Sequence, residues 1–138
     1  GKRLPTEAEW ERGAKSNLQN MQYPWGSRNP TCDLAVFYTG VSLCEKKPAP
    51  VGSRSPEGNS PDGLVDMAGN VAEWVMDWYG AYEEGNLSNP LGPDSGDLKV
   101  VRGGGFRDSG TSISTTTRWG ARAGDRSEGV GFRCAVSL

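Results

Sequence analysis

Oxygen-bearing side chains gather around a glycine turn near the middle of the chain, in the run from Gly63 to Trp78. Within it, Gly69, Asn70 and Glu73 place an amide and a carboxylate close together. Calcium is a hard cation that takes carboxylate and amide oxygens as ligands. The residue types and their spacing therefore indicate a candidate calcium site.

The residues after this turn alternate with the period of a β-strand. One side carries Trp74 and Trp78 with Ala72 and Met76, and the other side carries Glu73, Val75 and Asp77. The alternation predicts a half-buried strand. We expect its two tryptophans to fill the core rather than to stack against a ligand.

A second group of side chains suited to recognition lies between residues 102 and 125. Arginine and tryptophan are enriched at binding hot spots, so this stretch is a candidate ligand face. Structural salt bridges are the alternative for its arginines, as we expect for Arg102 and Arg133, and core packing is an equal alternative for the tryptophan. The candidate ligand-binding residues are Arg107, Asp108, Arg118, Trp119 and Arg122.

Composition excludes several classes of function. The chain has no histidine, which removes the commonest metal ligand and the usual neutral-pH base, and so weakens zinc, iron and Ser–His schemes. A net charge of −2 with interspersed signs gives no basic face of the kind that duplex binding needs, so nucleic acid is not expected as a partner. No stretch is apolar over the length of a membrane span.

The three cysteines fall into two groups. Cys32 and Cys44 lie in one polar, proline-flanked loop, where two reduced thiols and a disulfide are the alternatives, and a disulfide is favoured. Such a bond is typical of oxidising compartments, so an extracytoplasmic location (secreted, periplasmic or surface) is favoured over a reducing one. Cys134 lies in a short apolar strand, and we expect a buried thiol there.

Few regular elements are predicted. Thr6 and Glu9 form a capping box, so a helix is expected from Glu7 to Lys15 with Trp10 and Ala14 buried. Residues 16–61 and 80–96 are rich in turn-forming residues and are expected to be loop with short strands. Further strands are expected at 99–102 and 130–136, and residues 112–122 alternate weakly. The prediction is a coil-rich α+β domain with one clear helix and a small antiparallel sheet.

Six motifs in order carry a family resemblance. They are Arg3-Leu4-Pro5-Thr6-Glu7-Ala8-Glu9-Trp10-Glu11, Tyr23-Pro24-Trp25-Gly26, Pro50-Val51-Gly52-Ser53, Gly63 to Trp74, Arg102-Gly103-Gly104-Gly105-Phe106 and Gly131-Phe132-Arg133-Cys134-Ala135. The series resembles the formylglycine-generating enzyme (sulfatase-modifying factor) family over nearly the whole chain. The resemblance implies a C-type-lectin-like fold. It also implies a single domain over residues 1–138 that lacks its N-terminal portion. One candidate partner is therefore a separate chain or segment that completes this part of the fold.

The resemblance also bears on metals. In the family's enzymes two cysteines after the Arg-Gly-Gly motif bind copper(I), and those places fall at Asp108 and Ile113 in this chain. Copper(I) is soft and needs thiolates, so copper is not expected here. The family's calcium site resembles the Gly69 turn, with carbonyls from Gly69 and Val71 and side-chain oxygens from Asn70 and Glu73. A second family calcium site would fall near Asp33 and Leu34, but its later carboxylate would fall at residues 43–45, where the match fails. For Asp33 a solvated loop carboxylate is an equal alternative.

Two functions follow as hypotheses, and whether the chain is an enzyme stays open, with the balance against. The first is a calcium-stabilised, non-catalytic module that binds a protein, peptide or glycan through the candidate ligand face. The second is an oxidoreductase, of the formylglycine-generating or sulfoxide-synthase type, whose catalytic metal ligands lie in a missing portion.

Overall fold

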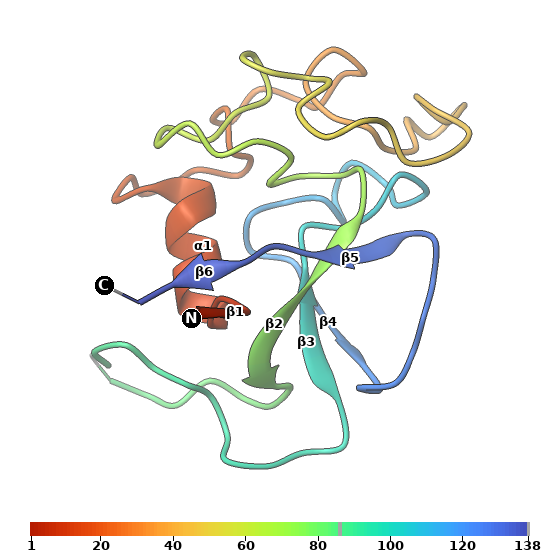
Figure 1. Cartoon of the computed structure of the whole chain (residues 1–138). Helices are drawn as coiled ribbons and strands as arrows, with labels where there is room; N and C mark the ends of the chain where they lie inside the picture. The colour runs from red at the N-terminus through yellow and green to blue at the C-terminus, as the bar shows by residue number, and fades with distance from the viewer. Residues whose placement is uncertain (86, 138) are drawn as a thin grey trace.

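The structure is a computed structural model that describes residues 1–85 and 87–137. One helix, a small four-stranded sheet and a two-stranded ribbon lie below a layer of long loops (Figure 1). No helix within the described residues is long and apolar enough to cross a membrane. The elements are β1 (Lys2–Arg3), α1 (Glu7–Lys15), β2 (Ala72–Trp78), β3 (Lys99–Arg102), β4 (Arg118–Ala121), β5 (Val130–Phe132) and β6 (Ala135–Val136).

Helix α1 begins and ends as the sequence predicts. The Thr6 hydroxyl accepts from the Glu9 backbone N–H at 3.1 Å, and the Glu9 carboxylate accepts from the Thr6 backbone N–H at 2.8 Å. Two of the free donors at the helix N-terminus are thereby satisfied. Trp10 and Ala14 are fully buried and pack with Met67, Val75 and Val100. Val75 belongs to β2, Val100 to β3, and Met67 to the turn that precedes β2.

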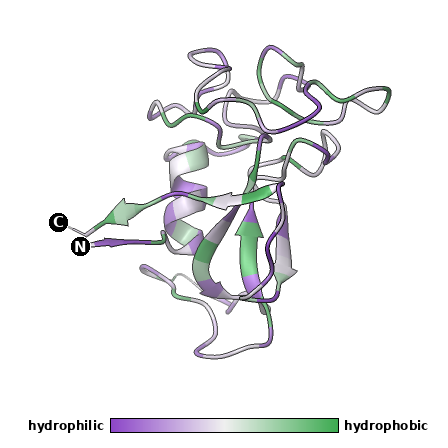
Figure 2. Cartoon of the chain, turned by 45° about the vertical axis from the view of Figure 1, so that its right-hand side comes forward, coloured by the Kyte–Doolittle hydropathy of each residue, from purple (hydrophilic) through white to green (hydrophobic). Residues whose placement is uncertain are grey.

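The main sheet is mixed, whereas the sequence predicted a small antiparallel sheet. Its order is β4-β3-β2-β5, in which β2 pairs with β3 and β3 with β4 antiparallel, but β2 pairs with β5 parallel. After β4 the chain crosses over β3 and β2 to the far edge, and β5 therefore runs in the same direction as β2. Figure 2 shows hydrophobic colouring along β3 at the centre of this sheet, where Val100 and Val101 are buried.

Strand β2 alternates as predicted, but the expectation that its tryptophans fill the core is wrong. The side that faces α1 and is buried carries Glu73, Val75 and Asp77, whereas Trp74 and Trp78 are only half-buried. The two carboxylates tolerate burial because each accepts hydrogen bonds from a distant part of the chain.

The predicted last strand is broken, and Cys134 is exposed rather than buried. Between β5 and β6, Arg133 turns inward and binds Glu73 through two nitrogens, at 2.5 and 2.6 Å. Because neighbouring side chains in extended chain point to opposite sides, Phe132 and Cys134 are directed outward. Strand β6 then pairs antiparallel with β1, so the two ends of the chain lie side by side (Figure 1).

The loop layer has its own small core and a covalent link. Tyr23, Ala35, Phe37, Ala68 and Ile113 form the second buried cluster. Cys32 and Cys44, twelve positions apart, are joined by a disulfide, as the sequence favours. Cys44 packs against this cluster, so the disulfide and the apolar contacts hold the same part of the loops.

Candidate functional site

The face of the sheet turned away from α1 carries a row of aromatic side chains. In register across the strands, Trp119 of β4 pairs with Val101, Val101 with Trp74 of β2, and Trp74 with Phe132 of β5. Residues that pair directly across a sheet point to the same face. Trp119 is 45% exposed and Phe132 is 67% exposed. We call this row, with the hollows beside it, the aromatic face.

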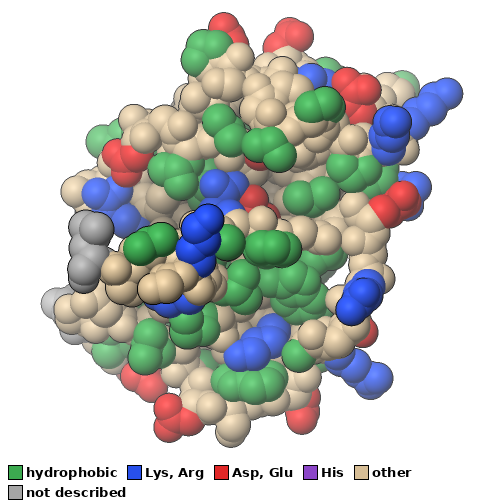
Figure 3. Space-filling model, in the orientation of Figure 1, with side chains coloured by type: hydrophobic (Ala, Val, Ile, Leu, Met, Phe, Trp, Pro, Cys, Tyr) green, Lys and Arg blue, Asp and Glu red, His purple; other side chains and the backbone are tan. Residues whose placement is uncertain are grey.

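Two hollows lie on the aromatic face. One, of about 310 Å³, is lined by Val101, Phe106, Arg107, Asp108 and Trp119 among others. The other, of about 500 Å³, is lined by Leu4, Trp74, Val75, Met76, Lys99, Ala123 and Phe132. Figure 3 shows hydrophobic side chains gathered where β2 and β5 lie toward the viewer, with lysine and arginine side chains at the edge. The chemistry offered is apolar and aromatic contact bordered by charge.

A tight glycine turn builds one end of the aromatic face. Gly104 has a φ of +66°, and a Cβ there would lie 2.9 Å from the Ser112 carbonyl oxygen, so a larger residue would not fit. The Asp108 carboxylate accepts from the Gly105 backbone N–H at 2.7 Å, which closes the turn. Arg107 is exposed at the rim, where it pairs with Glu128 at 2.5 Å.

The structure brings three of the five predicted ligand residues together. Arg107, Asp108 and Trp119 line the same hollow. Arg122 is exposed but lines neither hollow, and its backbone N–H donates to Asp125 at 3.1 Å. The sequence analysis did not predict Trp74 and Phe132 as part of the ligand face. The alternation of β2 was a signal for Trp74, because it placed this residue on the opposite side of the strand from Val75.

Arg118 belongs to the opposite side of the sheet. Its Nε and Nη2 donate to the two oxygens of buried Glu7 at 2.8 and 2.6 Å, and its Nη1 donates to the Gly80 carbonyl at 2.6 Å. Burial alone would lower the pKa of Arg118, but the hydrogen bonds and charge of Glu7 raise it. In the structure Arg118 forms a structural ion pair, the alternative reading from the sequence, and lies away from the aromatic face.

The two positions that the family resemblance assigns to copper-binding cysteines, Asp108 and Ile113, carry no thiol. Asp108 caps the glycine turn, and Ile113 is completely buried in the cluster with Phe37 and Ala68. The free thiol of Cys134 is exposed and sits between β5 and β6. The residues present therefore do not fit a copper(I) centre.

The predicted calcium side chains are engaged by protein groups. The Asn70 side chain accepts from the Ala49 N–H at 2.8 Å and donates to the Ala49 carbonyl at 3.2 Å. Glu73 is 5% exposed, and its oxygens accept from Arg133 and from the Trp10 indole at 2.7 Å. A guanidinium thus already neutralises Glu73. As arranged, these two side chains are not free ligands, and calcium at this turn stays a prediction.

The turn itself depends on glycine. Gly69 has a φ of +73°, and a Cβ there would lie 2.4 Å from the Val36 carbonyl oxygen. Its N–H donates to the Gly103 carbonyl, and the N–H of Asn70 donates to Val36. The Gly69 turn thereby ties β2, the glycine turn after β3 and the loop layer together.

A coil-rich α+β scaffold that presents a mixed sheet under a loop layer defines a C-type-lectin-like domain of the formylglycine-generating-enzyme type. The chain belongs to the family of the sulfatase-modifying factor enzyme 1-like domain, whose model matches residues 1–138. The resemblance drawn from the sequence motifs is thereby confirmed, as is the fold class.

Named relatives place the domain in different proteins. The chain is 36% identical, over all of its length and 21% of the relative, to the serine/threonine-protein kinase pkn1 of Chlamydia pneumoniae. It is 37% identical, over 98% of its length and 46% of the relative, to the formylglycine-generating enzyme of Streptomyces coelicolor. Among solved structures, Treponema denticola variable protein 1 matches with a TM-score of 0.81 and 32% identity, over 97% of this chain and 47% of that one. The chain therefore spans about half or less of the length of these relatives.

Proposed function

We propose that this domain is a non-catalytic binding module, which takes a protein, peptide or glycan ligand on the aromatic face. The observation that carries the proposal is the replacement of the thiolate pair. One of the two positions is a carboxylate used to cap a turn, and the other is an isoleucine with no exposed surface. Without thiolates the soft-metal chemistry of the enzymes has no ligands here.

The aromatic face supports a binding role. Exposed aromatic rings bordered by arginine are the residue types that contribute most to binding energy at interfaces. Trp119 and Phe132 are exposed at opposite ends of the row, and Arg107 stands at the rim. Similar chains also occur in a protein kinase and in Treponema denticola variable protein 1, which agrees with roles other than formylglycine formation.

The alternative is an oxidoreductase completed by a portion outside residues 1–138. The 37% identity to a formylglycine-generating enzyme favours it. Aerobic incubation of the domain with copper and a sulfatase-type Cys-x-Pro-x-Arg peptide, followed by mass spectrometry, distinguishes the two. We expect no formylglycine above a no-protein control, and its appearance would rule out the non-catalytic proposal.

Binding itself is tested by alanine substitution on the aromatic face. Peptide and glycan arrays, with pull-down of proteins, identify a ligand for the parent domain. Trp119→Ala should then weaken it by roughly 2 kcal/mol or more, as truncation of a hot-spot aromatic does. Val51→Ala, a change at an 82% exposed residue of the loop layer, is the control. A folded Trp119→Ala variant that binds like the parent would place the ligand elsewhere.

We also propose that calcium binds the native domain and stabilises it. A cation that binds only the native state raises the melting temperature by mass action. We expect calcium to raise it in the parent and not in Glu73→Ala. Glu73→Ala also removes the partner of Arg133 and so changes the melting temperature without calcium. The test is therefore the rise in melting temperature that calcium causes in each protein. An equal rise in both proteins would exclude Glu73 as a ligand.

A further inference from the structure

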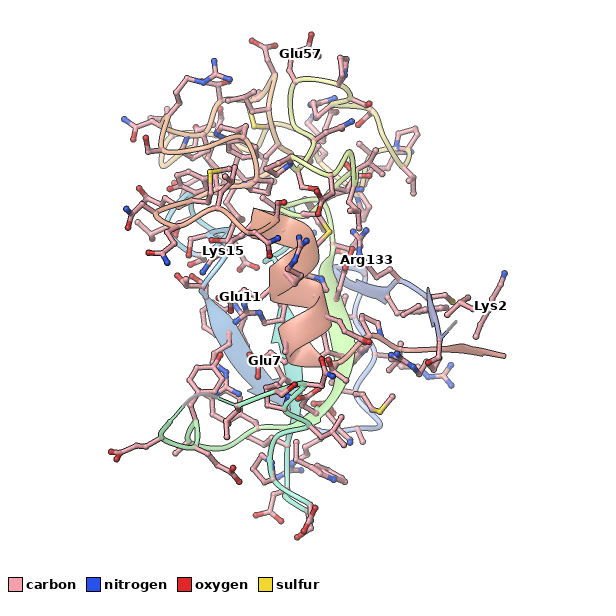
Figure 4. All side chains as sticks on the ribbon, turned by 90° about the vertical axis from the view of Figure 1, so that its left-hand side faces the viewer. Lys2, Glu7, Glu11, Lys15, Glu57 and Arg133 are labelled. Carbon is pink, nitrogen blue, oxygen red and sulfur yellow. A yellow bond between two sulfur atoms is a disulfide. The ribbon has the colours of Figure 1, made fainter. Side chains whose placement is uncertain are left out.

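A groove of about 710 Å³ lies on the α1 side of the sheet, opposite the aromatic face. One wall is α1, and the other is the segment of residues 80–85 and 87–93 that follows β2. Figure 4 views the molecule from this side and shows Glu7, Glu11 and Lys15 along α1, with that segment below them. Nothing in the proposed function uses this groove.

Asp77 of β2 forms the floor of the groove. It is 4% exposed, and its Oδ2 accepts from the Glu7 backbone N–H at 2.7 Å. Apart from the backbone of Asp77 itself, Glu7 is the one residue in 1–85 and 87–137 that donates a hydrogen bond to this carboxylate, so no other residue donates to Oδ1. This oxygen faces Gly92, where a Cβ would lie 3.3 Å from it. Gly92 has a φ of +68°, which suits glycine, and the absence of a side chain lets its backbone pack closely against Asp77.

The other deep charges of the groove are already compensated. Glu7 binds Arg118 and Arg102, and Glu11 binds Arg102 and Lys15. At the edge, Arg12 pairs with Asp62.

Asp77 has no such cation. Among the described residues no cation forms an ion pair with it, and the charge of nearby Lys99 lowers its pKa only slightly. The Lys99 amine instead donates to the Met76 carbonyl and lies over the Trp78 ring. Burial raises the pKa of Asp77, and the nearby Glu7 charge adds to the rise. Both agree with a carboxylate that lacks a bound cation.

The walls above Asp77 are apolar and open. Tyr82, Leu87 and Leu91 line the groove and are 64%, 47% and 66% exposed. Ala8, Pro90 and Pro93 complete this surface, and Glu83 adds a further acidic group to the lining. A buried carboxylate below exposed apolar walls is complementary to a cation carried on an apolar body.

We propose that this groove binds a small molecule in which a primary ammonium is attached to an aliphatic or aromatic body. The ammonium donates to Asp77 Oδ1 and supplies the missing cation. The body lies against Leu87 and Leu91, which removes apolar surface from water. The site is independent of the aromatic face and of any ligand bound there.

The probe is hexylammonium, compared with hexanol and hexanoate, which share its chain but carry no charge or a negative one. Titration into the domain, followed by two-dimensional NMR, should give saturable shifts at Ala8, Ala81 and Leu91. Hexanol and hexanoate should bind at least about tenfold more weakly, because a hydrogen bond between two charged groups is among the stronger ones. Equal affinity for hexylammonium and hexanol, or shifts confined to the aromatic face, would overturn the proposal.

Variants assign the ammonium to its carboxylate. Asp77→Asn keeps the shape and an acceptor for the Glu7 N–H but loses the charge, and it should weaken hexylammonium by about tenfold and leave hexanol unchanged. Asp94→Asn is the matched control, since Asp94 is exposed directly after this segment and does not line the groove. If Asp77→Asn does not fold, Leu87→Ala on the apolar wall decides, with weaker hexylammonium binding expected. Parent-like affinity in a folded Asp77→Asn variant would refute the assignment.

Discussion

Glu73 joins three parts of the chain that are far apart in sequence. Its carboxylate accepts from the Trp10 indole on α1 and from Arg133 between β5 and β6. A buried cation, Arg102, lies 5.1 Å from the Trp10 ring, and its Nε has no hydrogen-bond partner among the described groups. Contact with the face of an indole is a favourable place for such a guanidinium. Trp10 therefore serves both ion pairs and is more than core filling.

Removing the charge of Glu73 should be costly. In Glu73→Gln the Arg133 guanidinium loses its anion while the side-chain volume stays the same, and the loss of one partner of a buried pair typically costs about 3–5 kcal/mol. We expect a fall of at least about 2 kcal/mol in the free energy of unfolding measured with urea, since Arg133 is 22% exposed and partly hydrated.

The matched control for this prediction is Asp62→Asn, the same acid-to-amide change in the exposed pair with Arg12. Exposed pairs contribute about 0–1 kcal/mol, so its unfolding curve should almost coincide with that of the parent. Similar losses in the two variants would mean that burial of the Glu73 pair adds nothing.

At the scale of elements, α1 shows what a local signal can establish. The capping box, the helix ends and the two buried positions were all predicted correctly, because each depends on residues within a few positions of one another. Glu9 does more than the sequence suggested, since its carboxylate also binds Arg3 through both oxygens, at 2.6 and 2.7 Å. This pair joins the start of the helix to β1.

Glu9 should give α1 a dependence on acid. The hydrogen bond from Arg3, followed by that from the Thr6 backbone, lowers the pKa of Glu9 from 4.5 to about 2. A carboxyl whose pKa is lowered by folding stabilises the protein above pH about 4.5, and this contribution is lost as the pH falls toward about 2. In Glu9→Gln, stability should therefore change less than in the parent over that range, as followed by urea denaturation at several pH values. Glu57→Gln, on an exposed loop, serves as the control and should keep the slope of the parent; a parent-like slope in Glu9→Gln would contradict the prediction.

The elements that were predicted incorrectly depend on contacts over long separations. The alternation of β2 was correct, but the burial of Asp77 depends on the N–H of Glu7, 70 residues away, and that of Glu73 on Arg133, 60 residues away. A scale of hydrophobicity assigns such carboxylates to solvent, because their partners cannot be read from the strand itself. The same pair turned Cys134 outward. For the ligand site, Arg107, Asp108 and Trp119 were predicted because arginine, aspartate and tryptophan lie close together in that stretch of the sequence. The aromatic row could not be predicted in this way, because it depends on which residues pair across neighbouring strands.

The whole molecule has two cores with different supports. The lower core, around Trp10 and Val75, is enclosed by α1 and the sheet, and buried ion pairs surround it. The upper core, around Phe37 and Ile113, lies among loops that have no helix or extended sheet of their own. Backbone bonds from the Gly69 turn connect the two. The loops of the upper core therefore depend more on side-chain packing and on the Cys32–Cys44 bond.

Loss of that bond should lower the stability of the domain. A disulfide that closes a loop of this size contributes about 3 kcal/mol in the chain-entropy description, because it restricts the unfolded chain. The comparison is best made in a Cys134→Ser background, since Cys134 is free and exposed and would exchange with the other thiols. Adding Cys32→Ser and Cys44→Ser should then lower the free energy of unfolding in urea by about 3 kcal/mol. In the unaltered native protein, iodoacetamide should modify Cys134 alone, which shows that the bond is formed before its removal is measured. If the urea midpoint were the same with and without the two cysteines, the packing of Phe37 and Ile113 alone would be enough to hold the upper core.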